Sequence, residues 1–138
     1  MELYQSQNKE VETMEVKKYN FLIVDDIFMN RLLLKEIVSD LSNSVTEAEN
    51  GQQAIDILNS NNSIEVVLMD IEMPVMNGVE TTKYIRSKLS YPKNRIPIIA
   101  LTAHNPDDFF DDFSNAGFDE LLTKPYSFQK ILEVIKAI

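Results

Sequence analysis

The sequence predicts an α/β fold in which a doubly wound parallel sheet carries helices on both of its faces. Short apolar segments alternate with segments of helical periodicity, which is typical of consecutive β-α-β units. The chain of 138 residues is also long enough for one domain with a hydrophobic core. Because crossovers between parallel strands are right-handed, few topologies remain open.

Five strands are predicted from the short apolar runs. In chain order they cover residues 19–26, 44–50, 64–70, 96–103 and 119–125. The first strand ends in two acids, and the second is half-polar. The third and fourth have the apolar character of strands that are buried on both faces.

Five helices are predicted after these strands, one following each. In chain order they cover residues 28–42, 51–61, 78–89, 106–118 and 127–138. Helical spacing links Leu32, Leu33, Ile37 and Leu41 in the first helix, Ala54, Ile55 and Leu58 in the second, and Val79, Thr82 and Ile85 in the third. The fourth has a proline in its first turn and ends near Gly117, which are start and stop signals.

Composition narrows the classes of function. Residues 1–18 are polar and charged without a sustained period, so we expect a tail or linker there and one domain over 19–138. The formal net charge of -9 argues against a nucleic-acid-binding surface, which needs a basic patch. The absence of cysteine excludes disulfides, thiolate zinc sites and cysteine nucleophiles. We find no signal peptide and no apolar run long enough to cross a bilayer, so we expect a cytoplasmic domain without membrane contact.

Polar side chains stand where the predicted strands end. Asp25 and Asp26 follow the first strand, Asp70 the third, Thr102 the fourth and Lys124 the fifth. In an open parallel sheet, ligands bind outside the carboxyl ends of the strands, so these residues are expected at one edge. Carboxylates crowded there repel one another unless a cation relieves them, and ligands that are all oxygen favour Mg²⁺ over zinc.

This group of residues suits phosphoryl transfer. A free oxygen of Asp70 could attack phosphorus, because carboxylates are known to form aspartyl-phosphate. The Thr102 hydroxyl could donate to a phosphoryl oxygen, and the Lys124 ammonium adds a point charge suited to phosphate. Such a reaction depends on positioning and charge neutralisation more than on other covalent chemistry.

The motifs resemble those of the receiver domain of two-component response regulators. The resemblance covers about residues 19–138, and it rests on "LIVDD", "VVLMDIEMPVMNG", "PIIALTA" and "LLTKP" in this order and spacing. It implies a flavodoxin-like fold with strand order 2-1-3-4-5. It also implies signalling through a phosphohistidine donor, either a histidine kinase or a histidine phosphotransfer domain. On this interpretation the chain is not an enzyme beyond its own phosphorylation and dephosphorylation.

The resemblance also assigns roles to individual residues. It implies that Asp70 is the phosphoacceptor, that Asp25, Asp26 and Asp70 bind Mg²⁺, and that the backbone carbonyl of Glu72 is a further ligand. Thr102 corresponds to a switch hydroxyl and Lys124 to the partner of the phosphoryl group. The Lys124–Pro125 bond is similar to one that is cis in the family.

Two further features bear on the kind of receiver. The stretches "DDIFMNRLLLKEI" and "MPVMNGVETTKYIR" look most like receivers attached to hybrid histidine kinases. The chain departs from the family pattern at Leu121, where receivers often carry a tyrosine or phenylalanine three residues before the lysine. That leucine puts the usual coupling between the threonine and an aromatic ring in doubt.

Other interpretations stay open at this point. A phosphatase of the haloacid-dehalogenase type would use the same residue types, although its nucleophile stands on the first strand. A flavodoxin-like binding module for a nucleotide or flavin would want a glycine-rich phosphate loop, whereas the three glycines here are not clustered. Asp25 and Asp26 could also be no more than a helix N-cap.

Four residues near the predicted site have less defined roles. His104, the only histidine, is interpreted as a residue of the rim. Ile27, Phe28 and Met29, beside the acidic pair, either dock a phosphodonor helix or pack into the core.

Overall fold

The computed structural model describes residues 17–103 and 115–138. The strands are β1 (Tyr19–Val24), β2 (Ser42–Ala48), β3 (Val66–Asp70), β4 (Ile98–Thr102) and β5 (Glu120–Thr123). The α-helices are α2 (Phe28–Val38), α3 (Gly51–Ser60), α4 (Gly78–Lys88) and α6 (Phe128–Ala137). Two short 3-10 helices, η1 (Ser39–Leu41) and η2 (Lys93–Arg95), complete the described elements.

The five strands form one sheet, with every neighbouring pair parallel. Their order is β2-β1-β3-β4-β5, which confirms the predicted flavodoxin-like fold. Of the predicted fourth helix over 106–118, residues 106–114 lie outside the described part, and residues 115–118 form no helix. The predicted tail also falls mostly on residues that the structure does not describe, namely 1–16.

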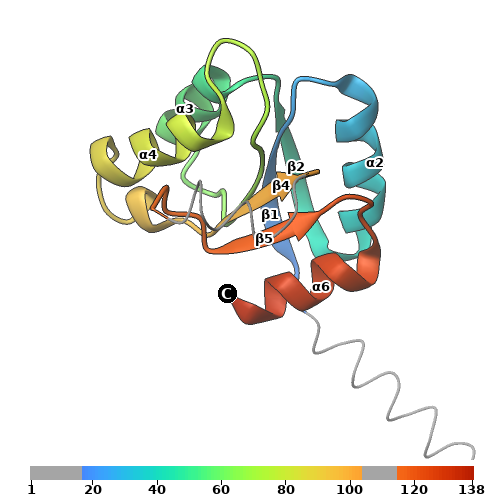
Figure 1. Ribbon diagram of the computed structural model, residues 1–138. Helices are drawn as coiled ribbons and strands as arrows, with labels where there is room; N and C mark the ends of the chain where they lie inside the picture. The colour runs from blue at the N-terminus through green and yellow to red at the C-terminus, as the bar shows by residue number, and fades with distance from the viewer. Residues whose placement is uncertain (1–16, 104–114) are drawn as a thin grey trace, which may run out of the picture.

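Helices cover both faces of the sheet (Figure 1). Successive side chains of a strand point to one face and then to the other. Leu22 and Val24 of β1 join the cluster that packs with α3 and α4, whereas Phe21 and Ile23 join the cluster that packs with α2 and α6. This alternation follows from the two-residue period of a strand. Both faces of β3 are therefore buried, which explains the short apolar run that leads to Asp70.

Side chains at the helix starts fix where three of the helices begin. Asn50 accepts a hydrogen bond from the backbone of Gln53 at 2.9 Å at the start of α3. Asn77 and Glu80 form a reciprocal capping box at the start of α4. Ser127 accepts from the backbone of Lys130 at 3.2 Å at the start of α6. Such caps satisfy amide groups that would otherwise lack partners.

The predicted inner face of the first helix is partly wrong. Leu32 and Leu33 are exposed, and the buried positions of α2 are Arg31, Leu34 and Val38. The run of three leucines fits helical spacing in more than one register, and the structure buries Leu34 on the same face as Arg31 and Val38. Arg31 can be buried because its charge is paired with Glu47 at 3.1 Å and its guanidinium has a backbone partner.

The boundary after this helix also differs from the prediction. The α-helix ends at Val38, a 3-10 turn follows, and β2 begins at Ser42 rather than at residue 44. The predicted inward residues of α3 are confirmed, since Ala54, Ile55 and Leu58 are all buried.

A half-buried arginine ties α4 to the starts of β4 and β5. The Arg86 guanidinium donates to the carbonyls of Asn94, Ile96 and Gly117 at 2.7 to 3.0 Å. It also pairs with Asp119 at 2.9 Å, and the same carboxylate oxygen accepts from the backbone of Ile98 at 2.7 Å. Burial lowers the pKa of Arg86, whereas the Asp119 charge opposes that shift.

We expect Arg86→Met to lower the free energy of unfolding by ~2–4 kcal/mol, because it leaves several buried acceptors without a donor. Urea unfolding followed by circular dichroism measures this change. The control is Lys83→Met on the exposed side of the same helix, which should change stability by less than ~0.5 kcal/mol. Equal stabilities of the two variants would contradict the role of Arg86.

Candidate metal centre at the carboxyl ends of the strands

Three aspartates meet at the carboxyl edge of the sheet. Asp25 and Asp26 follow β1 directly, and Asp70 is the last residue of β3. Each offers a carboxylate oxygen, and these oxygens lie within 4.8 Å of one another. The parallel pairing of β1 with β3 brings the two strand ends together, as the sequence predicted.

Asp25 is fully buried, and its two carboxylate oxygens have different surroundings. Oδ1 accepts hydrogen bonds from the Ile27 backbone at 2.9 Å and from the Asn30 side chain at 3.5 Å. Oδ2 is buried and has no hydrogen-bond partner among the described residues. Burial raises the pKa of Asp25, while the bonds to Oδ1 and the Lys124 charge lower it. Hydrogen bonds therefore orient Oδ1, whereas Oδ2 has no donor among the described residues.

The N-cap interpretation of the acidic pair is wrong. The N-cap residue of α2 is Ile27, and no side chain caps this helix. The hydrogen bond from the Ile27 backbone to Asp25 closes a local turn instead. It orients the Asp25 carboxylate and leaves Asp26 exposed beside it.

Asp70 is 6% exposed, and its carboxylate accepts from the backbone of Glu72 at 3.3 Å. Its pKa is raised to about 7, mainly by burial and next by the nearby charge of Asp25. The positive charge of Lys124 and the hydrogen bond from Glu72 oppose this shift. A buried carboxylate next to like charges is thus the central electrostatic feature of the site.

Two further predicted residues lie at the same edge. Thr102 is the last residue of β4 and is buried, and its carbonyl accepts from the backbone of Lys124 at 3.0 Å. Lys124 is exposed, yet its charge lowers the pKa of both Asp25 and Asp70. The Lys124–Pro125 bond is cis, as the resemblance implied. Glu72 is exposed, and His104 lies outside the described residues.

A glycine allows α4 to begin next to the site. A Cβ atom at Gly78 would stand 2.3 Å from the carbonyl oxygen of Asp70, closer than non-bonded atoms approach. The Gly78 backbone donates to the carbonyl of Ile71 at 2.8 Å, which closes the loop after β3. Glycine is the residue that permits such a close approach of the backbone, and the approach to Asp70 is visible only in the structure.

The donor set fits a hard divalent cation. The three carboxylates are oxygen ligands, the kind that Mg²⁺ prefers, and Mg²⁺ usually takes only one or two of them and keeps several waters. The Oδ2 atom of Asp25 supplies a buried oxygen for which residues 17–103 and 115–138 provide no hydrogen-bond partner. Asp25, Asp26 and Asp70 would hold such an ion, and it would relieve their mutual repulsion.

Sequence reasoning missed two residues that border the site. Arg31 donates to the carbonyl oxygen of Asp25 at 2.7 Å and links that end of β1 to Glu47 of β2. Tyr126 has a buried hydroxyl whose pKa is raised by burial and by the charges of Asp70 and Asp25. The arginine stood in an apolar helical pattern and the tyrosine after a proline, so neither position had a pattern that pointed to the site.

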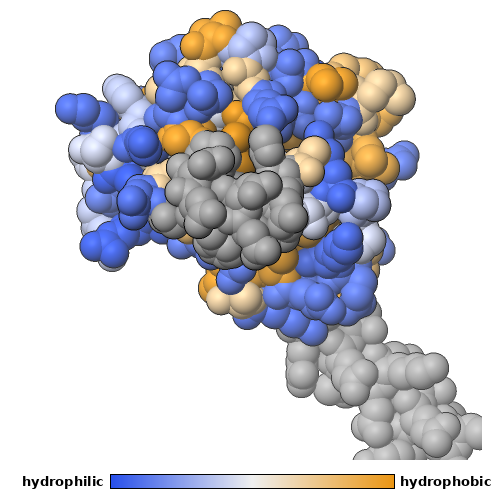
Figure 2. Space-filling view, in the orientation of Figure 1, coloured by the Kyte–Doolittle hydropathy of each residue, from blue (hydrophilic) through white to orange (hydrophobic). Residues whose placement is uncertain are grey.

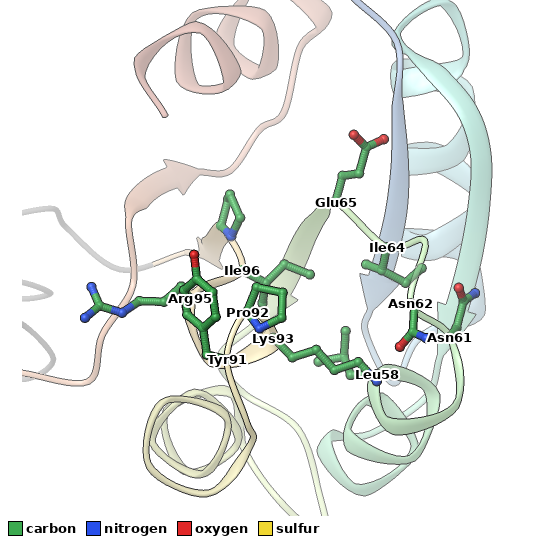
Figure 3. Close-up of a pocket in the computed structure, with 11 residues that line it drawn as sticks. Leu58, Asn61, Asn62, Ile64, Glu65, Tyr91, Pro92, Lys93, Arg95 and Ile96 are labelled. Atoms are coloured by element: carbon green, nitrogen blue, oxygen red, sulfur yellow. The ribbon is translucent and has the colours of Figure 1, made fainter.

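A surface pocket of about 350 Å³ lies elsewhere. Its lining comes from the end of α3, from the segment before β3 and from the loop before β4, and includes Leu58, Glu65, Tyr91 and Ile96 (Figure 3). These segments stand at the amino ends of the strands, whereas the aspartates stand at the carboxyl ends. The pocket is therefore separate from the acidic cluster.

No helix of the described chain has the length and apolar character to pass through a bilayer.

Comparison with known proteins identifies the class of this fold and site. The chain belongs to the response regulator receiver domain family, whose profile matches residues 21–136. Receivers are the phosphoacceptor modules of two-component signalling. The haloacid-dehalogenase interpretation is not supported, because the acidic pair follows the first strand and Asp70 ends the third.

Relatives include both kinases and stand-alone regulators. The chain is 30% identical over 156 residues to histidine kinase 5 of Arabidopsis thaliana and 36% identical over 118 residues to hybrid signal transduction histidine kinase I of Dictyostelium discoideum. These alignments cover 96% and 83% of this chain but only 17% and 7% of the kinases. Identity to two-component response regulator 24 of A. thaliana is 28% over 127 residues, covering 92% of this chain and 88% of that protein.

Solved structures share the fold. Chemotaxis response regulator CheY4 of Vibrio cholerae matches with a TM-score of 0.76 at 24% identity, covering 88% of this chain and 100% of that one. The receiver domain of sensor histidine kinase PA1611 from Pseudomonas aeruginosa PAO1 matches with a TM-score of 0.74 at 26% identity, covering 86% and 95%.

We expect the metal-free protein to lose stability as pH rises from about 4 to about 7, because Asp70 holds its proton in the folded state and releases it in the unfolded state. This favourable contribution is complete below the ordinary pKa of 3.8 and is lost as pH passes about 7. Asp70→Asn removes the titration, so the variant should exceed the wild type in stability at pH 8 by more than ~1 kcal/mol.

Urea unfolding in EDTA across pH 4 to 8 measures this difference. Asp40→Asn, at an exposed position in η1, is the matched control and should keep the wild-type pH slope. An unchanged slope in Asp70→Asn would show that the Asp70 carboxylate is not the titrating group.

Proposed function

We propose that this chain accepts a phosphoryl group on Asp70 from a phosphohistidine donor, in a reaction that requires Mg²⁺. The single observation that carries the proposal is the gathering of Asp25, Asp26 and Asp70 oxygens within 4.8 Å at the carboxyl edge of the sheet. A receiver in the same family, that of sensor histidine kinase PA1611, holds a magnesium ion in its active site cleft. That likeness supports the same metal here.

The transfer makes one bond and breaks one bond. An oxygen of the Asp70 carboxylate forms a bond to phosphorus as the bond from phosphorus to the histidine nitrogen breaks, and the histidine keeps that electron pair. The bound metal would neutralise charge on the phosphoryl oxygens. The chain's own residues orient the group: Glu72 holds Asp70 through its backbone N–H, and Lys124 adds a positive charge at the same edge. We assign Thr102 as a hydroxyl donor to the phosphoryl group and the Glu72 carbonyl as a further metal ligand.

An exposed apolar patch beside the acids would receive the donor. Ile27, Phe28 and Met29 are 51%, 62% and 64% exposed, so the alternative that they pack into the core is wrong. Leu32 and Leu33 continue the exposed apolar surface along α2. Figure 2 shows hydrophobic atoms gathered at this upper right end of the molecule. We infer that a helix of a histidine kinase or histidine phosphotransfer domain docks on this surface, named here the α2 patch.

The proposal extends to the setting of the domain. It assigns residues 1–18 to a linker and 19–138 to a cytoplasmic receiver that acts on no external substrate and does not bind nucleic acid. Its acidic net charge of -9 supports the last point. The likeness to hybrid kinases favours a receiver that passes phosphate along a relay.

We expect the wild-type protein to gain the mass of one phosphoryl group when it is treated with acetyl phosphate and Mg²⁺. Intact-mass spectrometry measures the gain. Removal of the metal with EDTA should abolish it, because the carboxylates would then repel the incoming phosphate. Asp70→Asn should take up none under either condition. A wild-type protein that stays unmodified, or an Asp70→Asn variant that is still modified, would refute the proposed function.

The role of the α2 patch is tested by separating docking from chemistry. Met29→Ser should slow transfer from a phosphorylated histidine phosphotransfer protein by roughly tenfold, since it removes apolar area from the interface. The same variant should react with acetyl phosphate at the wild-type rate, because that donor needs no docking. Tyr91→Ser, at an exposed position beside the pocket of Figure 3, is the control and should leave both rates unchanged. Equal loss with both donors would place Met29 in the site rather than in the interface.

A further inference from the structure

Tyr126 lies near the acidic cluster in space, although it is far from Asp25 and Asp70 in the sequence. It follows β5 by three residues and comes just after the cis Lys124–Pro125 bond. Its ring packs in part against the hydrophobic cluster that lies between the sheet and helices α2 and α6. The ring is therefore anchored to the core, which limits how far the residue can move.

The hydroxyl of Tyr126 is a buried donor without a partner. It makes no hydrogen bond within the described chain, although most buried polar groups in proteins have at least one. The charges of both Asp70 and Asp25 act on this hydroxyl and add to the effect of burial in raising its pKa. The phenol consequently keeps its proton at neutral pH and can act only as a neutral hydrogen-bond donor or acceptor.

The Tyr126 ring also lies near Lys124, whose charge lowers the pKa of Asp25 and Asp70. The Lys124 ammonium stands 6.0 Å from the centroid of the Tyr126 ring, at the outer range of a cation–π contact. Lys124 is otherwise exposed, and long exposed lysine side chains sample many rotamers. A ring at this distance limits the rotamers open to the Lys124 side chain, whose charge also acts on Asp25 and Asp70.

A second orphan atom lies in the same region. Oδ2 of Asp25 and the Tyr126 hydroxyl are both buried without a hydrogen-bond partner in the part of the chain that the structure describes, and the Asp25 charge acts on that hydroxyl. A buried donor and a buried acceptor that both lack partners are costly in the resting protein. A bound cation would satisfy the Asp25 oxygen, and a phosphoryl oxygen would accept a hydrogen bond from the Tyr126 hydroxyl.

We propose that Tyr126 is a positioning residue of the phosphoacceptor site, whose ring restrains Lys124 and whose hydroxyl donates a hydrogen bond to an oxygen of the loaded site. This inference rests on the proposed function, because a loaded site requires phosphate on Asp70. It adds a neutral donor to a site otherwise composed of charged groups and the Thr102 hydroxyl.

The test compares three variants in the full chain. Tyr126→Phe removes only the hydroxyl, Tyr126→Leu also removes the ring, and Tyr91→Phe is the control for loss of an exposed tyrosine hydroxyl. Two rate constants are measured with acetyl phosphate and saturating Mg²⁺: that of phosphate gain and that of spontaneous phosphate loss. Affinity for Mg²⁺ alone is measured by calorimetry.

We expect Tyr126→Phe to change at least one of the two rate constants by roughly three- to tenfold, the effect of one hydrogen bond, while Mg²⁺ affinity stays within about twofold. Tyr126→Leu should slow phosphate gain further, because Lys124 loses its restraint. Tyr91→Phe should match the wild type. A carbon-13 label at Cζ of tyrosine should show a shift of the Tyr126 signal when Mg²⁺ and beryllium fluoride are added, which a purely structural role would not produce.

The outcomes separate this inference from the proposed function. If the wild type gains phosphate but Tyr126→Phe matches it in both rate constants and the Cζ signal does not shift, the inference is wrong and the function stands. If Tyr126→Phe changes only stability, the inference is equally wrong. If the wild type gains no phosphate, both fall. A failure of Tyr126→Leu to fold leaves the decision to Tyr126→Phe, which keeps the ring.

Discussion

Mutual repulsion among buried carboxylates is the constraint on which the rest of this structure depends. Asp25 and Asp70 are removed from water and stand close together, and both have raised pKa values as a result. Charged groups in such an environment are costly unless a counter-charge reaches them. The Lys124 charge offsets only part of this cost, and the site is therefore suited to a cation.

The fold keeps these groups together through the apolar core below them. Strand β3 is buried on both faces, so Asp70 cannot move away from Asp25 without disrupting two hydrophobic clusters. Hydrogen bonds then set the orientation of each carboxylate: the Ile27 backbone fixes Asp25, and the Glu72 backbone contacts Asp70. The Arg31 guanidinium donates a hydrogen bond to the backbone carbonyl of Asp25. Rigid placement of this kind reduces the reorganisation that a loaded site requires.

The two faces of the sheet differ near the site. Leu121 packs in a small cluster with Ile71 and Ala100, whereas Tyr126 packs on the side of α2 and α6. The position of Leu121, which is aromatic in many receivers, is thus aliphatic in this chain. The aromatic ring of Tyr126 lies on the opposite face of the sheet. The side with α2 also carries the exposed apolar patch, so the ring and the proposed docking surface border the same half of the molecule.

The sequence by itself determined the fold class and which edge of the sheet the acids share. Alternating periods fixed the parallel sheet, and acids placed directly after apolar strands had to meet at its carboxyl edge, because parallel strands share that edge. The sequence did not determine which face of α2 is buried, because three consecutive leucines fit several helical faces. In the structure the buried face includes Arg31, which donates a hydrogen bond to the Asp25 carbonyl. The tertiary structure alone decided that Gly78 must lack a side chain beside Asp70, and that Tyr126 brings a buried hydroxyl near the acids. Both depend on contacts between segments that are distant in the chain or turned by a loop, and such contacts leave no periodic pattern in the sequence.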